Sequence, residues 1–282
     1  MQPNYLNSNA VFSLLPERSI YSHKGDFGKI LLLCGSLGYT GAAALAAMGA
    51  LRTGAGLVYL GVPRCIYEIV ATKLNEPIVF PLEDNRGMLS SEATAEIDKR
   101  LPKVDTVLIG PGMGQSEGTA FVLKHVLQNF NGTVVLDADG INQLCEHKNI
   151  VRGRTGCTIL TPHEGEFLRI GGTLEEGRQI GAERFALDLN AIVVLKGHNT
   201  VITDGRRTYI NPTGNPGMAV GGSGDVLAGM ITSLVGQGIC PLDAAACGVW
   251  LHGTAGDICA EKLGQYAMLP TDMLEVLPRL LK

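Results

Sequence analysis

A glycine-rich segment followed directly by an aspartate has the composition of a phosphoryl-transfer site. Residues 211–224 read NPTGNPGMAVGGSG, and Asp225 follows. Apolar residues then recur at helical spacing, so the sequence predicts a helix whose first residues are 222–224. The free amides at a helix N-terminus bind anions, and small residues let a phosphate approach the backbone. The helix dipole favours an ionised Asp225, which could accept the proton of an attacking hydroxyl.

The same segment could be no more than a helix N-cap with a flexible lead. Its 14 residues contain five glycines and two prolines, more loop-forming residues than a cap requires. The composition therefore favours a ligand-binding loop.

Four further polar or glycine-rich segments each follow a short apolar run that predicts a buried strand. The segments are residues 110–114 (GPGMG), 137–140 (DADG), 161–167 (TPHEGEF) and 196–200 (KGHNT). The carboxyl ends of parallel strands form the ligand-binding edge of an open α/β sheet. Structural alternatives remain: a tight turn for 110–114, a helix cap for Asp139, and a helix start with Pro162 as its first residue. We interpret His252 as a core or helix-face histidine.

Predicted strands and helices alternate along the chain. The strands are 29–34, 57–61, 77–80, 106–109, 134–136, 157–160 and 191–195, with a hairpin of 200–203 and 208–211. The helices are 42–53, 90–100, 119–129, 175–189, 243–263 and 271–281. This alternation predicts an α/β fold with a doubly wound, mainly parallel sheet, and we expect residues 1–282 to form one domain.

Composition narrows the class of partner. A net charge of −4, a pI near 5.9 and scattered basic residues argue against nucleic acid and acidic membranes, and favour small molecules. The seven cysteines show no Cys-x-x-Cys spacing, so neither disulfides nor a zinc site is expected. Residues 1–29 lack the apolar run of a signal peptide, which predicts a cytoplasmic protein. Neither a dinucleotide-binding fingerprint nor a P-loop motif occurs.

In combination, these motifs resemble the ribokinase-like superfamily and, within it, the ADP/ATP-dependent NAD(P)H-hydrate dehydratases. The residues that carry the likeness are 110–114, 136–139, 161–166, Lys196-Gly197 with Thr200, and 215–225. They follow the order of the family and span most of the chain.

The resemblance implies a role for each of these positions. Asp225 would be the catalytic aspartate, with Gly222 and Gly224 in its anion hole. The ADP or ATP co-substrate would be bound by Lys196, Gly197, His198, Asn199, Thr200, Asn215, Pro216, Gly217, Met218, Gly221, Gly222, Ser223 and Gly224. Hydrated NADH or NADPH would be held by Ala43, Gly112, Gly114, Asp137, His163, Glu164, Glu166 and Asp225.

The resemblance also implies Mg²⁺ and a homo-oligomer, usually a tetramer. No metal-ligand motif is evident, so we expect Mg²⁺ on the phosphates of the nucleotide. Ser223 stands where many relatives carry threonine, and the serine keeps the hydroxyl group. The epimerase domain often fused to this family is missing from the 282 residues, so epimerisation of the hydrate would need a separate protein.

The predicted reaction is repair of the hydrate: phosphorylation of the ring hydroxyl, then elimination of phosphate to give NADH or NADPH. With ADP as donor, AMP and phosphate are the other products. Two alternatives remain open at this point. One is a small-molecule kinase of the same fold, acting on a hydroxymethylpyrimidine or thiazole alcohol; the other is a nucleotide-binding regulator without turnover. The sequence also leaves open whether ADP or ATP is the preferred donor and whether hydrated NADH or hydrated NADPH is the preferred substrate.

Overall fold

A computed structural model describes residues 3–281, in which ten strands form one sheet. The strand order is β1-β12-β11-β10-β9-β8-β7-β2-β3-β4, and each neighbouring pair is parallel except the two that involve β11. The strands are β1 (Asn4–Tyr5), β2 (Lys29–Leu33), β3 (Leu57–Pro63), β4 (Ile78–Leu82), β7 (Thr106–Ile109), β8 (Thr133–Leu136), β9 (Thr158–Leu160), β10 (Ile192–Leu195), β11 (Thr200–Thr203) and β12 (Thr208–Asn211). A small hairpin of β5 (Asp84–Asn85) and β6 (Met88–Leu89) lies outside this sheet.

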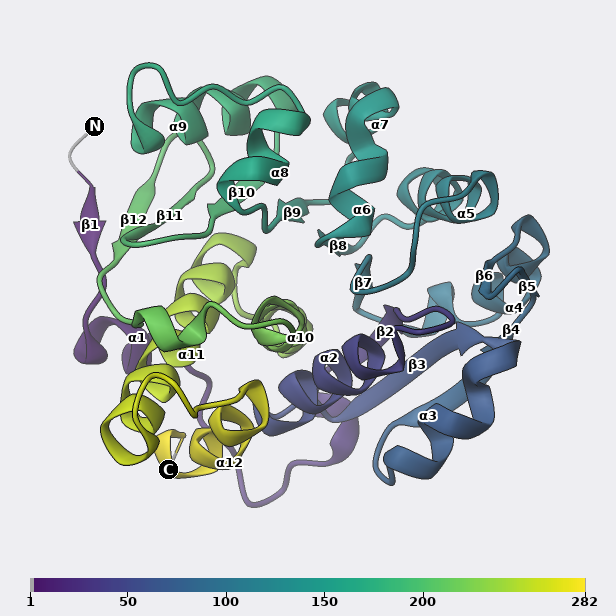
Figure 1. The fold of residues 1–282 in the computed structure, drawn as a ribbon, viewed down its shortest axis with the longest axis horizontal. Coiled ribbons are helices and arrows are strands. Elements are labelled where there is room, and N and C mark those ends of the chain that lie inside the picture. The colour runs from purple at the N-terminus through teal and green to yellow at the C-terminus, as the bar shows by residue number, and fades with distance from the viewer. Residues whose placement is uncertain (1–2, 282) are drawn as a thin grey trace.

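Helices cover both faces of the sheet (Figure 1). One face carries α1 (Ser8–Leu14), α2 (Thr40–Arg52), α3 (Tyr67–Lys73), α10 (Ser223–Gly236), α11 (Pro241–Leu263) and α12 (Pro270–Leu280). The other carries α4 (Thr94–Asp98), α5 (Glu117–Asn129), α6 (Asp139–Asn142), α7 (Lys148–Arg152), α8 (Glu164–Arg169) and α9 (Arg178–Leu189). Short 3-10 helices are η1 (Lys24–Phe27), η2 (Arg64–Ile66), η3 (Ser91–Ala93), η4 (Leu101–Lys103), η5 (Gln143–Glu146) and η6 (Pro216–Met218).

Strand β2 shows why the sequence specifies this three-layer arrangement. Its side chains alternate between the two cores: Ile30 and Leu32 pack under the α2 and α10 side, whereas Leu31 and Leu33 pack under the α5 side. All four are fully buried. A continuous apolar run is therefore required, because both faces of a parallel strand are covered.

Glycines bring α10 and α2 into close contact. A Cβ at Gly49 of α2 would lie 2.4 Å from the carbonyl oxygen of Val226, and one at Gly229 of α10 would lie 2.0 Å from that of Ala46. The two helices thus pack backbone to backbone, which fixes the N-terminus of α10 at the carboxyl edge of the sheet.

The predicted mainly parallel sheet and the hairpin are confirmed, but several helix boundaries differ. Residues 90–100 form a 3-10 turn and the short helix α4, and the helix predicted from residue 175 begins at Arg178. Pro162 is not the first helical residue: α8 begins at Glu164, because His163 is its N-cap and closes a capping box with Glu166. Sequence reasoning missed α1, α3, α7 and β1. Among residues 3–281, no helix combines the length and apolar character needed to cross a bilayer.

Candidate active site

The N-terminus of α10 has the form that the sequence predicts for an anion site. Gly222 is the N-cap with φ +98°, a left-handed conformation that favours glycine, and no side chain caps the helix. A Cβ at Gly222 would also lie 2.4 Å from Leu45 Cδ1. The Ser223 amide donates to the Val220 carbonyl oxygen at 3.3 Å. The Gly224 amide in the first turn of α10 meets no capping side chain and faces a possible ligand.

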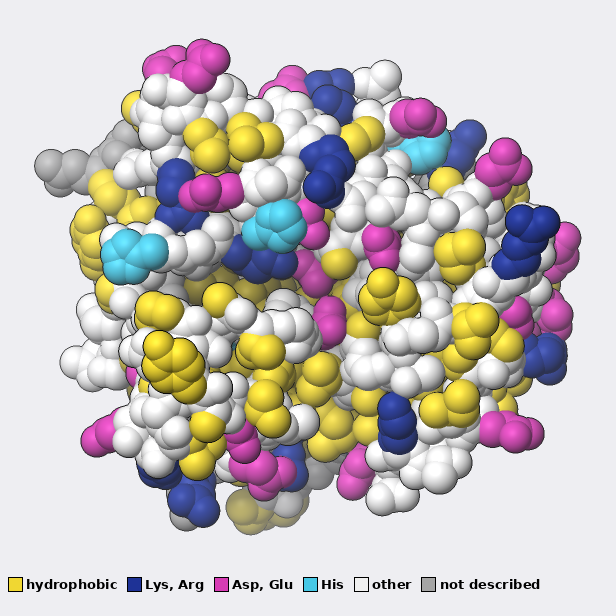
Figure 2. Space-filling model, in the orientation of Figure 1, with side chains coloured by type: hydrophobic (Ala, Val, Ile, Leu, Met, Phe, Trp, Pro, Cys, Tyr) yellow, Lys and Arg dark blue, Asp and Glu magenta, His cyan; other side chains and the backbone are white. Residues whose placement is uncertain are grey.

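A cavity of about 630 Å³ opens beside this helix start. Its lining is His163, Lys196, Gly197, His198, Thr200, Asn211, Thr213, Gly214, Asn215, Pro216, Met218, Ala219, Val220, Ser223, Gly224, Leu227, Val249, His252 and Gly253. Figure 2 shows the hollow between the α8 and α9 side and the α10 to α12 side. Most residues predicted to bind the nucleotide line it; Asn199, Gly217, Gly221 and Gly222 are not part of the lining but are adjacent in sequence to residues that are.

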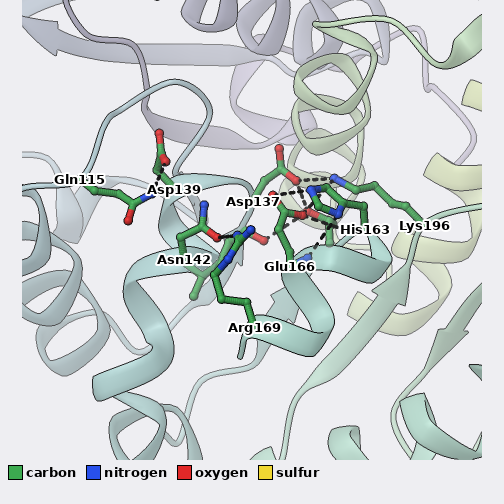
Figure 3. A network of polar contacts seen from close by, with 10 residues as sticks. Gln115, Asp137, Asp139, Asn142, His163, Glu166, Arg169 and Lys196 are labelled. Carbon is green, nitrogen blue, oxygen red and sulfur yellow. Dashed lines mark hydrogen bonds and ion pairs between the residues drawn. The ribbon is translucent and has the colours of Figure 1, made fainter. Parts of the chain in front are cut away.

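The buried carboxylates of Asp137 and Glu166 lie beside the partly exposed Lys196 (Figure 3), and the three are here called the carboxylate–lysine cluster. Lys196 is the member that lines the cavity. Lys196 Nζ is 2.9 Å from Asp137 Oδ1 and 4.0 Å from Glu166 Oε2. Thr161 Oγ1 donates to Asp137 Oδ1 at 2.7 Å, and Glu166 Oε2 accepts from the His163 amide at 2.9 Å. Strand ends β8, β9 and β10 thus converge on one ion-paired group.

Asp225 has a raised pKa next to this cluster. Burial and the Asp137 carboxylate raise the pKa of Asp225 from 3.8 to about 6, although Lys196 opposes the shift. The side chain is half-buried. A Cβ at the neighbouring Gly224 would lie 3.4 Å from Lys196 Nζ and 3.8 Å from Asp137 Oδ2, so the helix start faces the cluster. The sequence predicts that the helix dipole favours an ionised Asp225; in the folded protein the net shift of its pKa is upward, with desolvation as the largest cause.

Lys196 remains a cation in this position. Burial alone would lower its pKa, but Asp137, Glu166 and Asp225 together raise the pKa above its usual value. A permanent positive charge therefore lies between the helix N-terminus and the buried acids. A carboxyl with a pKa of about 6 beside it can both accept and hold a proton near neutral pH.

The residues predicted for the hydrated dinucleotide fall into two groups. His163 lines the cavity described above, and Asp137 and Glu166 belong to the carboxylate–lysine cluster, whereas Ala43, Gly112 and Gly114 lie at or beside the turn after β7. Ala43 is fully buried in α2, and a Cβ at Gly112 would lie 2.7 Å from Ala42 Cβ. Gly114 donates its amide to Asp139 Oδ2 at 2.9 Å. Asp139, which also accepts from Gln115 at 3.1 Å (Figure 3), thus fixes the turn after β7.

Sequence reasoning missed the contribution of α11. His252 lines the cavity, with its Nε2 3.3 Å from Ser223 Oγ, so its interpretation as a plain core histidine is incomplete. Burial lowers the pKa of His252 to about 4, which keeps the imidazole neutral. Asp257 accepts from the Gly214 amide at 2.9 Å and from Asn215 Nδ2 at 3.0 Å, and so holds the loop before α10.

Two glycines within α11 could have indicated from the sequence that another segment packs closely on this helix. A Cβ at Gly253 would lie 2.2 Å from Thr213 Oγ1, and one at Gly256 would lie 2.3 Å from Met218 Sδ. Glycine inside a helix usually marks the close approach of another segment. Here that segment is the loop of residues 212–221, which packs directly on α11.

The described residues do not form a multi-ligand metal site. No group of three or more histidine, cysteine, aspartate or glutamate side chains in residues 3–281 is arranged to hold an ion. Asp137 and Glu166 are already engaged by Lys196. Mg²⁺ at this site would depend on oxygen ligands that the nucleotide and water supply.

The mainly parallel sheet, with an uncapped helix start and an aspartate beside a cavity at its carboxyl edge, defines a protein of the ribokinase-like class. A solved ribokinase-like superfamily protein from Enterococcus faecalis matches with a TM-score of 0.87 and 27% identity over 99% of this chain and 95% of that one. Within this class, the chain belongs to the NAD(P)H-hydrate dehydratase family, which matches residues 30–279.

Three relatives illustrate the family. The ADP-dependent (S)-NAD(P)H-hydrate dehydratase of Bacillus subtilis is 34% identical over 96% of this chain and 95% of its own length. The crystal structure of the ADP/ATP-dependent NAD(P)H-hydrate dehydratase from Bacillus subtilis, co-crystallised with ATP/Mg²⁺, has a TM-score of 0.84 and 31% identity over 99% and 98% of the two chains. The bifunctional NAD(P)H-hydrate repair enzyme Nnr of Moorella thermoacetica is 44% identical over 96% of this chain and 52% of its own length.

This chain spans about half the length of the bifunctional relatives that it matches. A hydroxyethylthiazole kinase from Pyrococcus horikoshii shares the fold alone, with a TM-score of 0.66 and 17% identity. The family match therefore favours the dehydratase interpretation over the kinase and regulator alternatives.

Proposed function

We propose that this protein is an ADP- or ATP-dependent dehydratase of hydrated NADH and NADPH. The observation that carries the proposal is that Ser223 and Gly224, at the start of α10, line a cavity of about 630 Å³ and that Asp225 follows them directly. Family membership supplies the substrate class, because a relative that matches along nearly its whole length is named an ADP-dependent (S)-NAD(P)H-hydrate dehydratase.

The hydroxyl on the hydrated nicotinamide ring is a poor leaving group, so the first step converts it to a phosphate ester. The hydroxyl oxygen attacks the terminal phosphorus of the nucleotide, and the bond to AMP, or to ADP when ATP is the donor, breaks. Asp225 accepts the hydroxyl proton, and the Gly224 amide at the start of α10 binds the phosphoryl oxygens. Phosphate then leaves with the carbon–oxygen electron pair as the ring nitrogen donates electrons, and the adjacent ring carbon loses a proton. The products are reduced dinucleotide, phosphate and AMP or ADP.

Lys196 has two roles in this scheme. Its ion pair with Asp137 holds the ammonium beside the start of α10, where negative charge gathers during phosphoryl transfer. It also opposes the rise in the pKa of Asp225, so that this carboxyl, with a pKa of about 6, is mostly ionised at neutral pH. The lysine thereby limits the pKa of the proton acceptor and places a positive charge beside the site of the phosphoryl group.

The nucleotide would lie in the cavity with its phosphates toward Ser223 and Gly224. The loops of residues 196–200 and 211–218 form much of the wall, and Leu227 and Val249 offer apolar surface to a base. The Bacillus subtilis relative was co-crystallised with ATP and Mg²⁺, and we propose the same pair of ligands here. No step of the mechanism depends on a protein ligand to the metal.

We further propose that the chain is a cytoplasmic homotetramer of single-domain subunits and that a separate protein epimerises the hydrate. The family resemblance supports the assembly. The additional length of the bifunctional relatives is consistent with a second activity encoded outside the matched half. Analytical ultracentrifugation checks the tetramer.

The dehydratase proposal is tested by absorbance. Hydrated NADH and hydrated NADPH, incubated with Mg²⁺ and either ADP or ATP, should regain the absorption band of the reduced nicotinamide. Asp225→Asn serves as the matched control, because it keeps the shape of the side chain and removes the proton acceptor. Failure of both nucleotides with both hydrates would contradict the proposal. A stable phosphorylated alcohol among the products would indicate a kinase instead.

A further inference from the structure

One arginine outside the predicted motifs binds the backbone of the nucleotide-side loop. Arg178 Nη2 donates to the carbonyl oxygens of Leu195 at 3.0 Å and Lys196 at 2.9 Å. Its Nη1 donates to the carbonyl oxygens of His198 and of Asn199, the latter at 3.2 Å. A single guanidinium therefore contacts four carbonyls within five consecutive residues.

The stability of its own helix does not explain this arginine. Arg178 is the first residue of α9, after the N-cap Gly177. A cation at a helix N-terminus is opposed by the macrodipole. The contacts with the loop of residues 195–199 compensate for this unfavourable position.

The loop is built to receive the guanidinium. Gly197 has φ +143°, and a Cβ at this position would lie 2.7 Å from Arg178 Nη2. Asn199 also has a positive φ, +53°, which is uncommon for a residue other than glycine. Such a backbone persists only where its surroundings determine it, and here the surroundings are the side chain of Arg178.

The same arginine reaches the turn that begins α8. Arg178 Nε lies 2.9 Å from Glu164 Oε1, and Glu164 is the first residue of that helix. The two segments are also joined through the backbone, since the Lys196 amide donates to the Pro162 carbonyl oxygen at 2.8 Å. The loop on the nucleotide side and the turn that carries His163 are therefore joined by an ion pair and a backbone hydrogen bond.

We propose that Arg178 is a positioning residue that fixes the loop of residues 195–199 for the nucleotide and, through Glu164, couples nucleotide binding to dinucleotide binding. This inference rests on the proposed function, because it assigns one ligand to each of the two joined segments. Arg178 does not line the cavity, so it acts through Lys196, Gly197 and His198, which do.

The first test is the affinity for ADP, measured by calorimetry with Mg²⁺ and without hydrate. Arg178→Met should raise the Kd about 10- to 100-fold, the range for loss of hydrogen bonds to a charged group. Arg178→Lys should give a smaller increase, because an ammonium cannot reach all four carbonyls. Arg152→Met is the matched control: Arg152 pairs with Asp188 near the opposite end of α9 and should leave the Kd unchanged.

The second test is coupling. Saturating NADPH, which cannot be turned over with ADP, should tighten ADP binding to the wild-type protein by about fivefold or more. In Glu164→Gln, the ratio of the ADP Kd without NADPH to the ADP Kd with NADPH should be close to one. An Arg178→Met protein that binds ADP within twofold of the wild type would overturn the positioning role, and Arg178→Lys decides it if the methionine variant does not fold.

An unchanged ratio in Glu164→Gln, or a ratio of one in the wild type, would overturn the coupling. These outcomes are distinct from failure of the proposed function. A wild type that repairs hydrated NADH while Arg178→Met keeps its ADP affinity overturns only the positioning role. A wild type that binds no nucleotide overturns both.

Discussion

Replacing Lys196 by methionine should destabilise the folded protein strongly, because it leaves a buried carboxylate without its cation. Asp137 is 2% exposed and lies 2.9 Å from Lys196 Nζ. Removing one partner of a buried ion pair costs about 3–5 kcal/mol. Thr161 still donates to Asp137 at 2.7 Å, and the lysine side chain is 21% exposed, so the lower limit of about 3 kcal/mol applies.

For a chain of this size, that loss lowers Tm by about 6–12 °C. Scanning calorimetry and urea unfolding at pH 7 without ligands measure both quantities. Adding Asp137→Asn to Lys196→Met should recover about 2 kcal/mol, because the double variant buries no unpaired charge. Lys99→Met is the control: its exposed pair with Glu96 should contribute less than about 1 kcal/mol. This account would be refuted if Lys196→Met lowered the free energy of unfolding by less than about 1 kcal/mol. It would also be refuted if the changes in unfolding free energy of Lys196→Met and Asp137→Asn simply added in the double variant.

Four further predictions concern the proton acceptor and the nucleotide loop. Asp225→Asn should lower turnover by about 10²- to 10⁴-fold while the hydrate still binds, which single-turnover and binding assays separate. The pKa of Asp225 rises from 3.8 in the unfolded chain to about 6 in the folded protein, so ionising this carboxyl lowers the stability of the fold. This loss of stability is absent below a pH of about 4 and complete above a pH of about 6. The Tm of Asp225→Asn relative to the wild type should therefore increase between these two pH values. For the same reason, kcat/KM of the wild type should fall with an apparent pKa of about 6 as the pH decreases, and a flat profile from pH 5 to 8 would exclude Asp225 as the base. Asp257→Ala removes the hydrogen bonds to Gly214 and Asn215 and should weaken ADP binding about tenfold, with NADPH binding unchanged, as measured by calorimetry.

The sheet was predictable from sequence because its strands are buried on both faces. Continuous apolar runs such as those of β7 and β10 leave little ambiguity, and a polar or glycine-rich segment follows each of them. The start of α10 was predictable for a similar reason: a change from loop residues to a helical apolar pattern occurs within a few positions around Gly222.

The remaining features depend on contacts between distant segments. Strand β1 has two residues and exists only because it pairs with β12. The pKa of Asp225 depends on Asp137, 88 positions earlier, and on burial that no local pattern reports. Arg178 is 17 or more positions from the carbonyls it binds, and its hydrogen-bond donors meet backbone oxygens that are identical at every residue. Such a partner leaves no mark on the composition of the loop except the glycine at 197.

Gly253 and Gly256 of α11 restrict how the protein could be engineered for heat resistance. Replacing a mid-helix glycine with alanine normally stabilises a helix by about 1 kcal/mol, and screens for thermal tolerance favour such changes. At Gly253 and Gly256 the added methyl group would collide with Thr213 and Met218 and displace the loop from the helix. Alanine at either position would therefore favour the helix but deform the nucleotide pocket. A screen for a higher melting temperature and a screen for turnover should then select different residues at these two positions.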